Sequence, residues 1–179
     1  MTGFLRFLGI ANVAVWFGAA IFFTFAVGPG IFSDEMRSVL GADPSTFNFY
    51  AGGVALVVIK RYFILQYVCG TLAVLHLLAE RLYLGRKTHR YMLGLLIFIF
   101  GLGLIGGFGL QPRMKSLRQT MYSSTATPQQ KDAAHHAFGI WHGVSMAGNL
   151  LIIAGLAIYL VRVARPSEAS RYGTVYHIP

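Results

Sequence analysis

Four long apolar runs constrain the fold of this chain more than any other feature. The hydrocarbon core of a bilayer is about 30 Å thick, and an α-helix crosses it with about 20 residues. Each run reaches that length, and most charged residues lie near the run ends. We therefore predict an all-α integral membrane four-helix bundle, with helices over about residues 5–32, 62–83, 91–110 and 128–163.

The composition agrees with a membrane protein of a single domain. Of 179 residues, 55% are hydrophobic and only 12% are charged, compared with about 25% charged in soluble domains. The net charge of +9 does not indicate nucleic-acid binding, because the basic residues flank apolar runs, where they anchor helices. We expect membrane lipids as partners and no nucleic acid.

The fourth run begins with a strong helix-start signal. Thr127 is suited to the N-cap, Pro128 to the first helical position, and Gln130 completes a Thr-x-x-Gln capping box. No further proline occurs before Pro166. One helix can therefore extend for roughly 55 Å, and we expect about three turns of it to project beyond the membrane.

The segments between the spans are harder to assign. Phe47–Ile59 is apolar but too short to span, so we predict a short interfacial helix there, or a helix that leads into the second span. We predict a turn-like basic loop over 111–126 and an irregular tail over 166–179. The domain thus covers residues 1–165.

The connection 84–90 is short and strongly basic, with Arg86, Lys87 and Arg90. Short loops rich in lysine and arginine stay on the cytoplasmic side. An even number of spans places both termini on that same side. We therefore expect cytoplasmic termini in a bacterial inner membrane.

Polar residues within the spans predict contacts between helices. Depth estimates at 1.5 Å per residue place Asn12 with His76 in one layer, and Gln66 with His142 and Ser145 in another. Asn149 lies between the two layers. Such groups commonly join membrane helices by hydrogen bonds, but they also mark cofactor or transport pathways, and both interpretations stay open.

Imidazole and thioether groups near one end of the bundle suggest a metal. Such ligands suit Cu(I), and the candidates are His142, Met146 and His135, with Met114 or Met121 as further ligands. We expect no haem held by two histidines, because His76 and His142 fall in opposite leaflets. A haem held by a single histidine is a further alternative.

No set of residues typical of an enzyme converges in the sequence. Paired carboxylates, a phosphate-binding glycine loop and a Ser/His/Asp set are all missing from the predicted spans. Gly139-x-x-x-Gly143 instead fits the small-xxx-small pattern of closely packed membrane helices. We expect a non-enzymatic protein, an accessory subunit that packs against other subunits of a membrane complex.

Several motifs carry a family resemblance. They are WFGAAIFFTFAVGPGIF over 16–32, RYFILQ over 61–66, Pro112 after the third run and FGIWHGVSMAGNL over 138–150. Together they resemble the TMEM205-like family of four-helix membrane proteins, the DUF4149 type, whose activity is not established. The chain is more distantly similar to CopD-like copper-resistance membrane proteins. The resemblance implies a four-helix bundle and keeps copper as an alternative.

Overall fold

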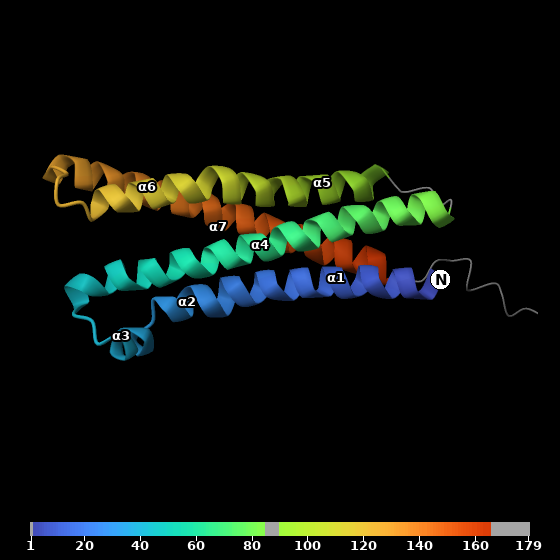
Figure 1. Cartoon of the computed structure of the whole chain (residues 1–179), viewed down its shortest axis with the longest axis horizontal. Coiled ribbons are helices and arrows are strands. Elements are labelled where there is room, and N and C mark those ends of the chain that lie inside the picture. Colours follow the sequence, from blue (N-terminus) through green and yellow to red (C-terminus); the bar gives the residue numbers. More distant parts are fainter. Residues whose placement is uncertain (1, 85–89, 166–179) are drawn as a thin grey trace, which may run out of the picture.

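A computed structural model describes residues 2–84 and 90–165, and all regular structure in these ranges is helical. Four helices are long and apolar enough to cross a membrane, over Gly3–Ile31, Thr46–Leu82, Arg90–Met121 and Pro128–Ala164. They lie side by side along the long axis of the molecule (Figure 1). The predicted membrane four-helix bundle is therefore confirmed.

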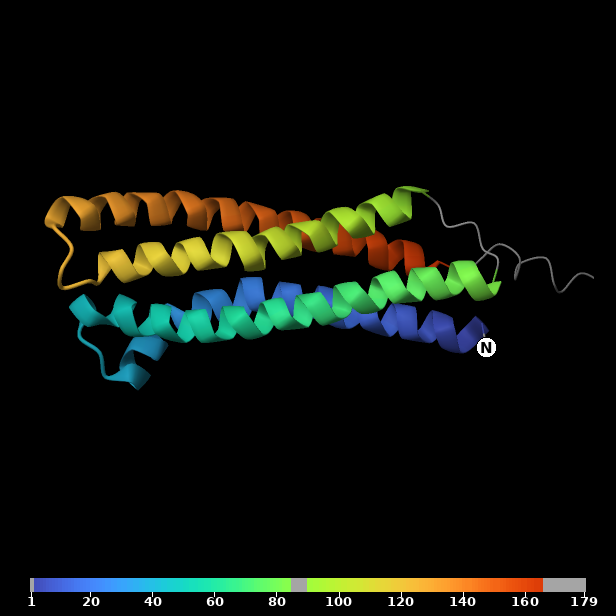
Figure 2. The same cartoon turned by 45° about the horizontal axis from the view of Figure 1, so that its top comes forward.

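The four long helices form a closed ring. The first consists of α1 (Thr2–Phe22), η1 (Phe23–Val27) and α2 (Gly28–Ile31), and the second is α4 (Pro44–Leu84). The third consists of α5 (Arg90–Leu104), η2 (Ile105–Leu110) and α6 (Gln111–Met121), and the fourth is α7 (Pro128–Ala164). Going round the ring, α1 contacts α4, α4 contacts α5, α5 contacts α7 and α7 contacts α1. Figure 2 shows the same arrangement after a rotation of 45°.

Two segments of π-helix, η1 and η2, interrupt the first and third long helices. Each precedes a proline, Pro29 or Pro112, whose ring clashes with the carbonyl four residues earlier and which has no N–H to donate. Widening the preceding turn relieves that clash and keeps the helix continuous. The loop predicted over 111–126 is consequently wrong for most of its length, because α6 continues to Met121.

Of the two alternatives predicted for Phe47–Ile59, the separate interfacial helix is wrong, and the helix that leads into the second span is confirmed. It forms the first part of α4, which is helical without a break from Pro44 to Leu84. Phe47 and Ala51 are buried in a small cluster with Ile31 of α2. Burial of this apolar face explains why the segment packs against the bundle instead of leaving it.

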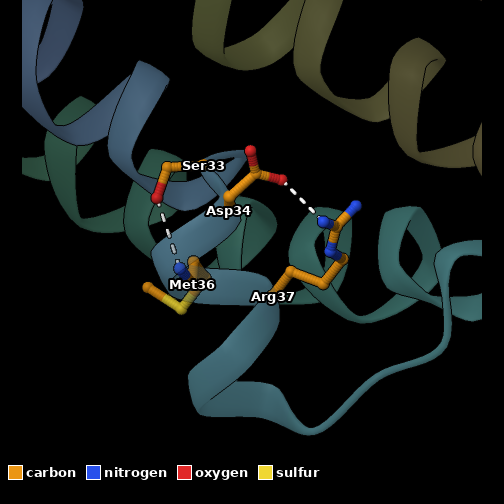
Figure 3. Close-up of polar contacts among 4 residues, drawn as sticks. All are labelled: Ser33, Asp34, Met36 and Arg37. Carbon is orange, nitrogen blue, oxygen red and sulfur yellow. Dashed lines mark hydrogen bonds and ion pairs between the residues drawn. The ribbon is translucent and has the colours of Figure 1, made fainter.

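A short helix, α3 (Asp34–Leu40), connects the first and second long helices. Its N-cap is Ser33, whose hydroxyl accepts a hydrogen bond from the Met36 amide at 3.2 Å (Figure 3). Asp34 and Arg37 form an ion pair at 2.9 Å on its surface. Gly41 ends α3 with a left-handed φ of 56°, a conformation that glycine adopts at little cost.

The fourth long helix begins as predicted. The Thr127 hydroxyl accepts from the Gln130 amide, and the Gln130 side chain accepts from the Thr127 amide, so the capping box is present. The helix is 37 residues long, about 55 Å. The basic connection over 85–89 and the predicted tail over 166–179 lie outside the described residues.

The main core lies within the ring of four helices. Val13, Trp16, Leu96, Ile99 and Leu156 are each at most 1% exposed. Glycines allow the helices to approach closely around them. A Cβ at Gly155 would lie 2.7 Å from Cγ1 of Ile99, and the ring of Phe100 occupies the space where Gly70 has no side chain.

Candidate functional site: a polar layer in the bundle core

A hydrogen-bonded chain joins three of the long helices inside the bundle. The Tyr62 hydroxyl of α4 donates to Oδ1 of Asn149 in α7 at 2.8 Å. Nδ2 of Asn149 donates to the Thr24 hydroxyl of η1 at 2.5 Å. That hydroxyl in turn donates to the carbonyl of Ala20 at 2.7 Å. All four groups thus have partners in the part of the bundle where water is scarce.

The π-helical segments border this chain on two sides. Phe23 of η1 stacks on the Tyr62 ring, with centroids 4.1 Å apart and an interplanar angle of 5°. On the next residue of α4, the ring of Phe63 lies 3.0 Å from where a Cβ on Gly106 of η2 would stand. Tyr62 and Phe63 thus pack against both widened turns.

Gln66 lies one helical turn from Tyr62 and is only 1% exposed. Both polar atoms of its amide lack a hydrogen-bond partner among the described residues. Its Oε1 faces α5, 3.1 Å from where a Cβ on Gly103 would stand. The predicted hydrogen-bonded layer of Gln66 with His142 is therefore wrong, and Asn149 pairs with Tyr62 and Thr24 instead.

Trp16 of α1 is the second buried side chain with an unpaired polar atom. It is 1% exposed, and its indole Nε1 has no partner within the described part of the chain. Together with Gln66, it makes the polar layer of the core incompletely satisfied.

Asn12 and His76 each form a hydrogen bond between α1 and α4. The predicted contact between these two side chains is wrong, because each bonds to a backbone carbonyl instead. Nδ2 of Asn12 donates to the carbonyl of Cys69 at 2.9 Å. Nε2 of His76 is 2.8 Å from the carbonyl of Leu5. The His76 ring fills the space beside Gly9, where a Cβ would lie 2.5 Å from Cε1. These contacts fix the register of the two helices and leave His76 Nε2 occupied.

The predicted metal ligands lie on the outside of α7. His135, His142 and Met146 are exposed, while Ser145 is half-buried. The His142 ring stacks on Phe138, with centroids 6.1 Å apart. His142 and Met146 are one turn apart, but His135 is seven residues from His142, about 10.5 Å along the axis. One ion cannot bind both histidines at about 2 Å.

Other groups also fail to complete a metal centre around His142. Met114 and Met121 are half-buried in α6. Across residues 2–84 and 90–165, no three His, Cys, Asp or Glu side chains are grouped to hold a metal ion. His142 and Met146 therefore form at most a pair of ligands open to a third from elsewhere.

Sequence reasoning did not assign Thr24 or Tyr62 to the polar layer. Tyr62 directly follows Lys60 and Arg61, which suggested the end of a span instead of its interior. Thr24 lies in an aromatic run that predicts a lipid-facing helix. The usable signal for Thr24 was its position five residues before Pro29, where a widened turn reorients side chains.

Comparisons with known proteins yield a family but no characterised relative. A family model described as a domain of unknown function, DUF4149, matches residues 12–123. This range begins in α1 and ends just after α6, before α7 starts. No curated protein and no solved structure gives a significant match to the chain.

Proposed function

The chain belongs to the DUF4149 family, and we propose that it is a non-enzymatic accessory subunit that packs against a larger membrane protein complex. The outward face of α7 carries this proposal. At about 100° per residue, Gly139, Gly143, Ala147 and Ala154 fall within an arc of about 80°. All four are exposed, and among residues 139–154 Leu150 alone adds a large side chain to that arc. We call these four residues the small-residue strip.

Glycine in a helix facing lipid needs a reason, because it costs about 1 kcal/mol relative to alanine. Inside the bundle the reason is visible, since Gly9, Gly70 and Gly155 each admit a neighbouring side chain. At Gly139 and Gly143, an added Cβ would meet nothing within 4 Å. Close approach of a transmembrane helix from another subunit would explain the small-residue strip.

The interior polar groups support a non-enzymatic role. The side chains of Asn12, His76, Tyr62 and Asn149 each bond to a neighbouring helix. Groups used to join helices are fixed in place and are not presented to a substrate. The resemblance to TMEM205-like proteins adds no activity to this picture.

The proposal includes a location. We place the protein in a bacterial inner membrane with both termini in the cytoplasm, because the connection that holds Arg86, Lys87 and Arg90 is the densest basic segment beside the spans. The start of α1 and the end of α7 lie at one end of the bundle, where the Arg6 guanidinium donates to the carbonyl of Ala164 at 2.8 Å.

Gly143→Leu tests the accessory-subunit proposal directly. The parent protein, extracted from native membranes in mild detergent, should co-purify with stoichiometric partner chains identified by mass spectrometry. Gly143→Leu should lose them. Gly94→Leu is the matched control, because Gly94 is also exposed with nothing within 4 Å but lies on α5. A parent that purifies as a lone chain, or partners retained by Gly143→Leu, would refute the proposal.

Copper handling is a second proposal, favoured by the exposed pair of His142 and Met146 and by the distant similarity to CopD-like proteins. A His142→Ala, Met146→Leu double variant should lose Cu(I) binding in a competition titration with a chromogenic chelator. His136→Ala should retain it, because this equally exposed histidine points about 120° away from His142 around α7. Unchanged binding by the double variant would remove the proposal.

A further inference from the structure

Within residues 2–84 and 90–165, two buried polar side chains have polar atoms without a hydrogen-bond partner. Gln66 has a free NH₂ group and a free carbonyl oxygen, and Trp16 has a free indole N–H. Each side chain is 1% exposed. Burying such a group without a hydrogen bond is unfavourable, and neither lipid nor the apolar core can supply the missing bond. Buried polar groups of this kind are commonly bonded to internal water.

The two side chains lie at the same level of the bundle. α1 and α4 are antiparallel, and their hydrogen bonds pair Asn12 with Cys69 and Leu5 with His76. Both pairs have residue numbers that add to 81, so Trp16 lies opposite residue 65. Gln66 is therefore offset from Trp16 by only about 1.5 Å along the axis. Both side chains point into the core enclosed by the four helices.

The third group at this position is the Tyr62 hydroxyl. Gln66 lies one helical turn from Tyr62 on α4, but its amide does not reach hydrogen-bonding geometry with this hydroxyl. The hydroxyl uses its proton on Asn149 and therefore keeps lone pairs free to accept a bond. Two unused donor groups and two unused acceptors thus lie within about one helical turn of each other along the core.

We propose that this level is a buried water-binding site, formed by the Gln66 amide, the Trp16 indole N–H and the Tyr62 hydroxyl. A water oxygen can accept from the indole and the amide NH₂, and its protons can be donated to Gln66 Oε1 and the Tyr62 oxygen. The Tyr62–Asn149–Thr24 chain continues from this site to the half-buried Thr24 of η1.

The two tryptophans of the chain make the site accessible to measurement. In the Trp141→Phe protein, reconstituted in nanodiscs with ¹⁵N-indole labelling, the one remaining indole signal belongs to Trp16. We expect a cross-peak between this N–H and water. Gln66→Met, which keeps the volume but removes the amide, should abolish the cross-peak and shift the Trp16 fluorescence to shorter wavelength. Leu96→Met is the control at a fully buried apolar position and should change neither.

The parent spectrum decides the question even when Gln66→Met does not fold. A Trp16 indole without a water cross-peak would overturn the proposal. A cross-peak of equal intensity in folded Gln66→Met would also overturn it, because the amide would then not hold the water.

Discussion

Replacing Tyr62 with phenylalanine removes one hydroxyl from the core and leaves the aromatic ring in place. The ring continues to stack on Phe23, 4.1 Å away, so the variant removes the 2.8 Å hydrogen bond to Asn149 and leaves the aromatic packing unchanged. Hydrogen bonds between membrane helices contribute about 0.6 kcal/mol on average and up to about 1.7 kcal/mol. We expect Tyr62→Phe to lower the free energy of unfolding within that range.

Asn149→Leu removes two bonds, to Tyr62 and to Thr24. At about 0.6 kcal/mol each, it should cost about 1.2 kcal/mol, and more if the buried Tyr62 hydroxyl finds no other acceptor. Each single variant loses the Tyr62–Asn149 bond, but the double variant loses the same bond only once. The double-mutant cycle should therefore give a coupling energy of about 0.6 kcal/mol between Tyr62 and Asn149.

The free energy of unfolding is measured for the parent, the two single variants and the double variant. The assay is equilibrium unfolding in mixed micelles with increasing sodium dodecyl sulfate, followed by circular dichroism. Tyr67→Phe is the matched control, because Tyr67 lies in the same helix, is partly exposed and makes no hydrogen bond to another helix in the described part of the chain. It should change the free energy of unfolding by less than about 0.5 kcal/mol. A coupling energy within about 0.3 kcal/mol of zero, or a Tyr67→Phe cost equal to that of Tyr62→Phe, would refute the reasoning.

Two further predictions concern packing and pH. Gly155→Ala should destabilise the bundle by about 1–3 kcal/mol, because its methyl would lie 2.7 Å from Cγ1 of the buried Ile99. Gly148→Ala is the control. Its methyl would meet nothing within 4 Å, so it should be neutral or stabilising in the same unfolding assay. A hydrogen bond from the Ser33 hydroxyl, and then one from the backbone of Glu35, hold the pKa of the exposed Glu35 carboxyl below its ordinary value of 4.5. The resulting contribution to the stability of α3 is present above pH 4.5 and is lost as the pH falls through the lowered pKa. An NMR titration should show this pKa rising in Ser33→Ala, and an unchanged value would contradict the assignment.

Hydropathy and helix length were sufficient to predict the four spans, because the membrane leaves so few ways to satisfy the backbone. The end of the third long helix was misplaced. The basic, turn-like sequence over 111–126 suggested a loop, yet the π-helical turn of η2 absorbs the clash of Pro112 and α6 continues. In a soluble protein the same proline would more often end the helix. For Phe47–Ile59 the sequence left two alternatives open, because length alone does not distinguish an interfacial helix from the start of a longer one, and the structure confirms the second.

Pairing of the polar residues could not be predicted from depth alone. The depth estimate took the second span as residues 62–83, with its middle near Ala73. Since α4 begins at Pro44, the middle of the helix does not lie at Ala73. Contacts also depend on how each helix is rotated. Asn12 and His76 lie within a few ångströms in depth by that estimate, yet each reaches a backbone carbonyl of the opposite helix. Gln66 and Asn149 were correctly identified as interior polar groups, but Asn149 bonds to Tyr62 and Thr24, and the Gln66 amide has no hydrogen-bond partner among the described residues.

The widened turns and the polar layer belong to one structural solution. Pro29 and Pro112 each deprive a membrane helix of a backbone hydrogen bond, and η1 and η2 lie where those losses occur. Tyr62 and Phe63 of α4 pack against both segments. Thr24, within η1, then anchors Asn149 and through it Tyr62. Side-chain hydrogen bonds thus join three helices at the level where two of the four long helices depart from α-helical geometry. The Tyr62–Asn149–Thr24 chain and the two π-helical segments therefore lie in the same region of the bundle.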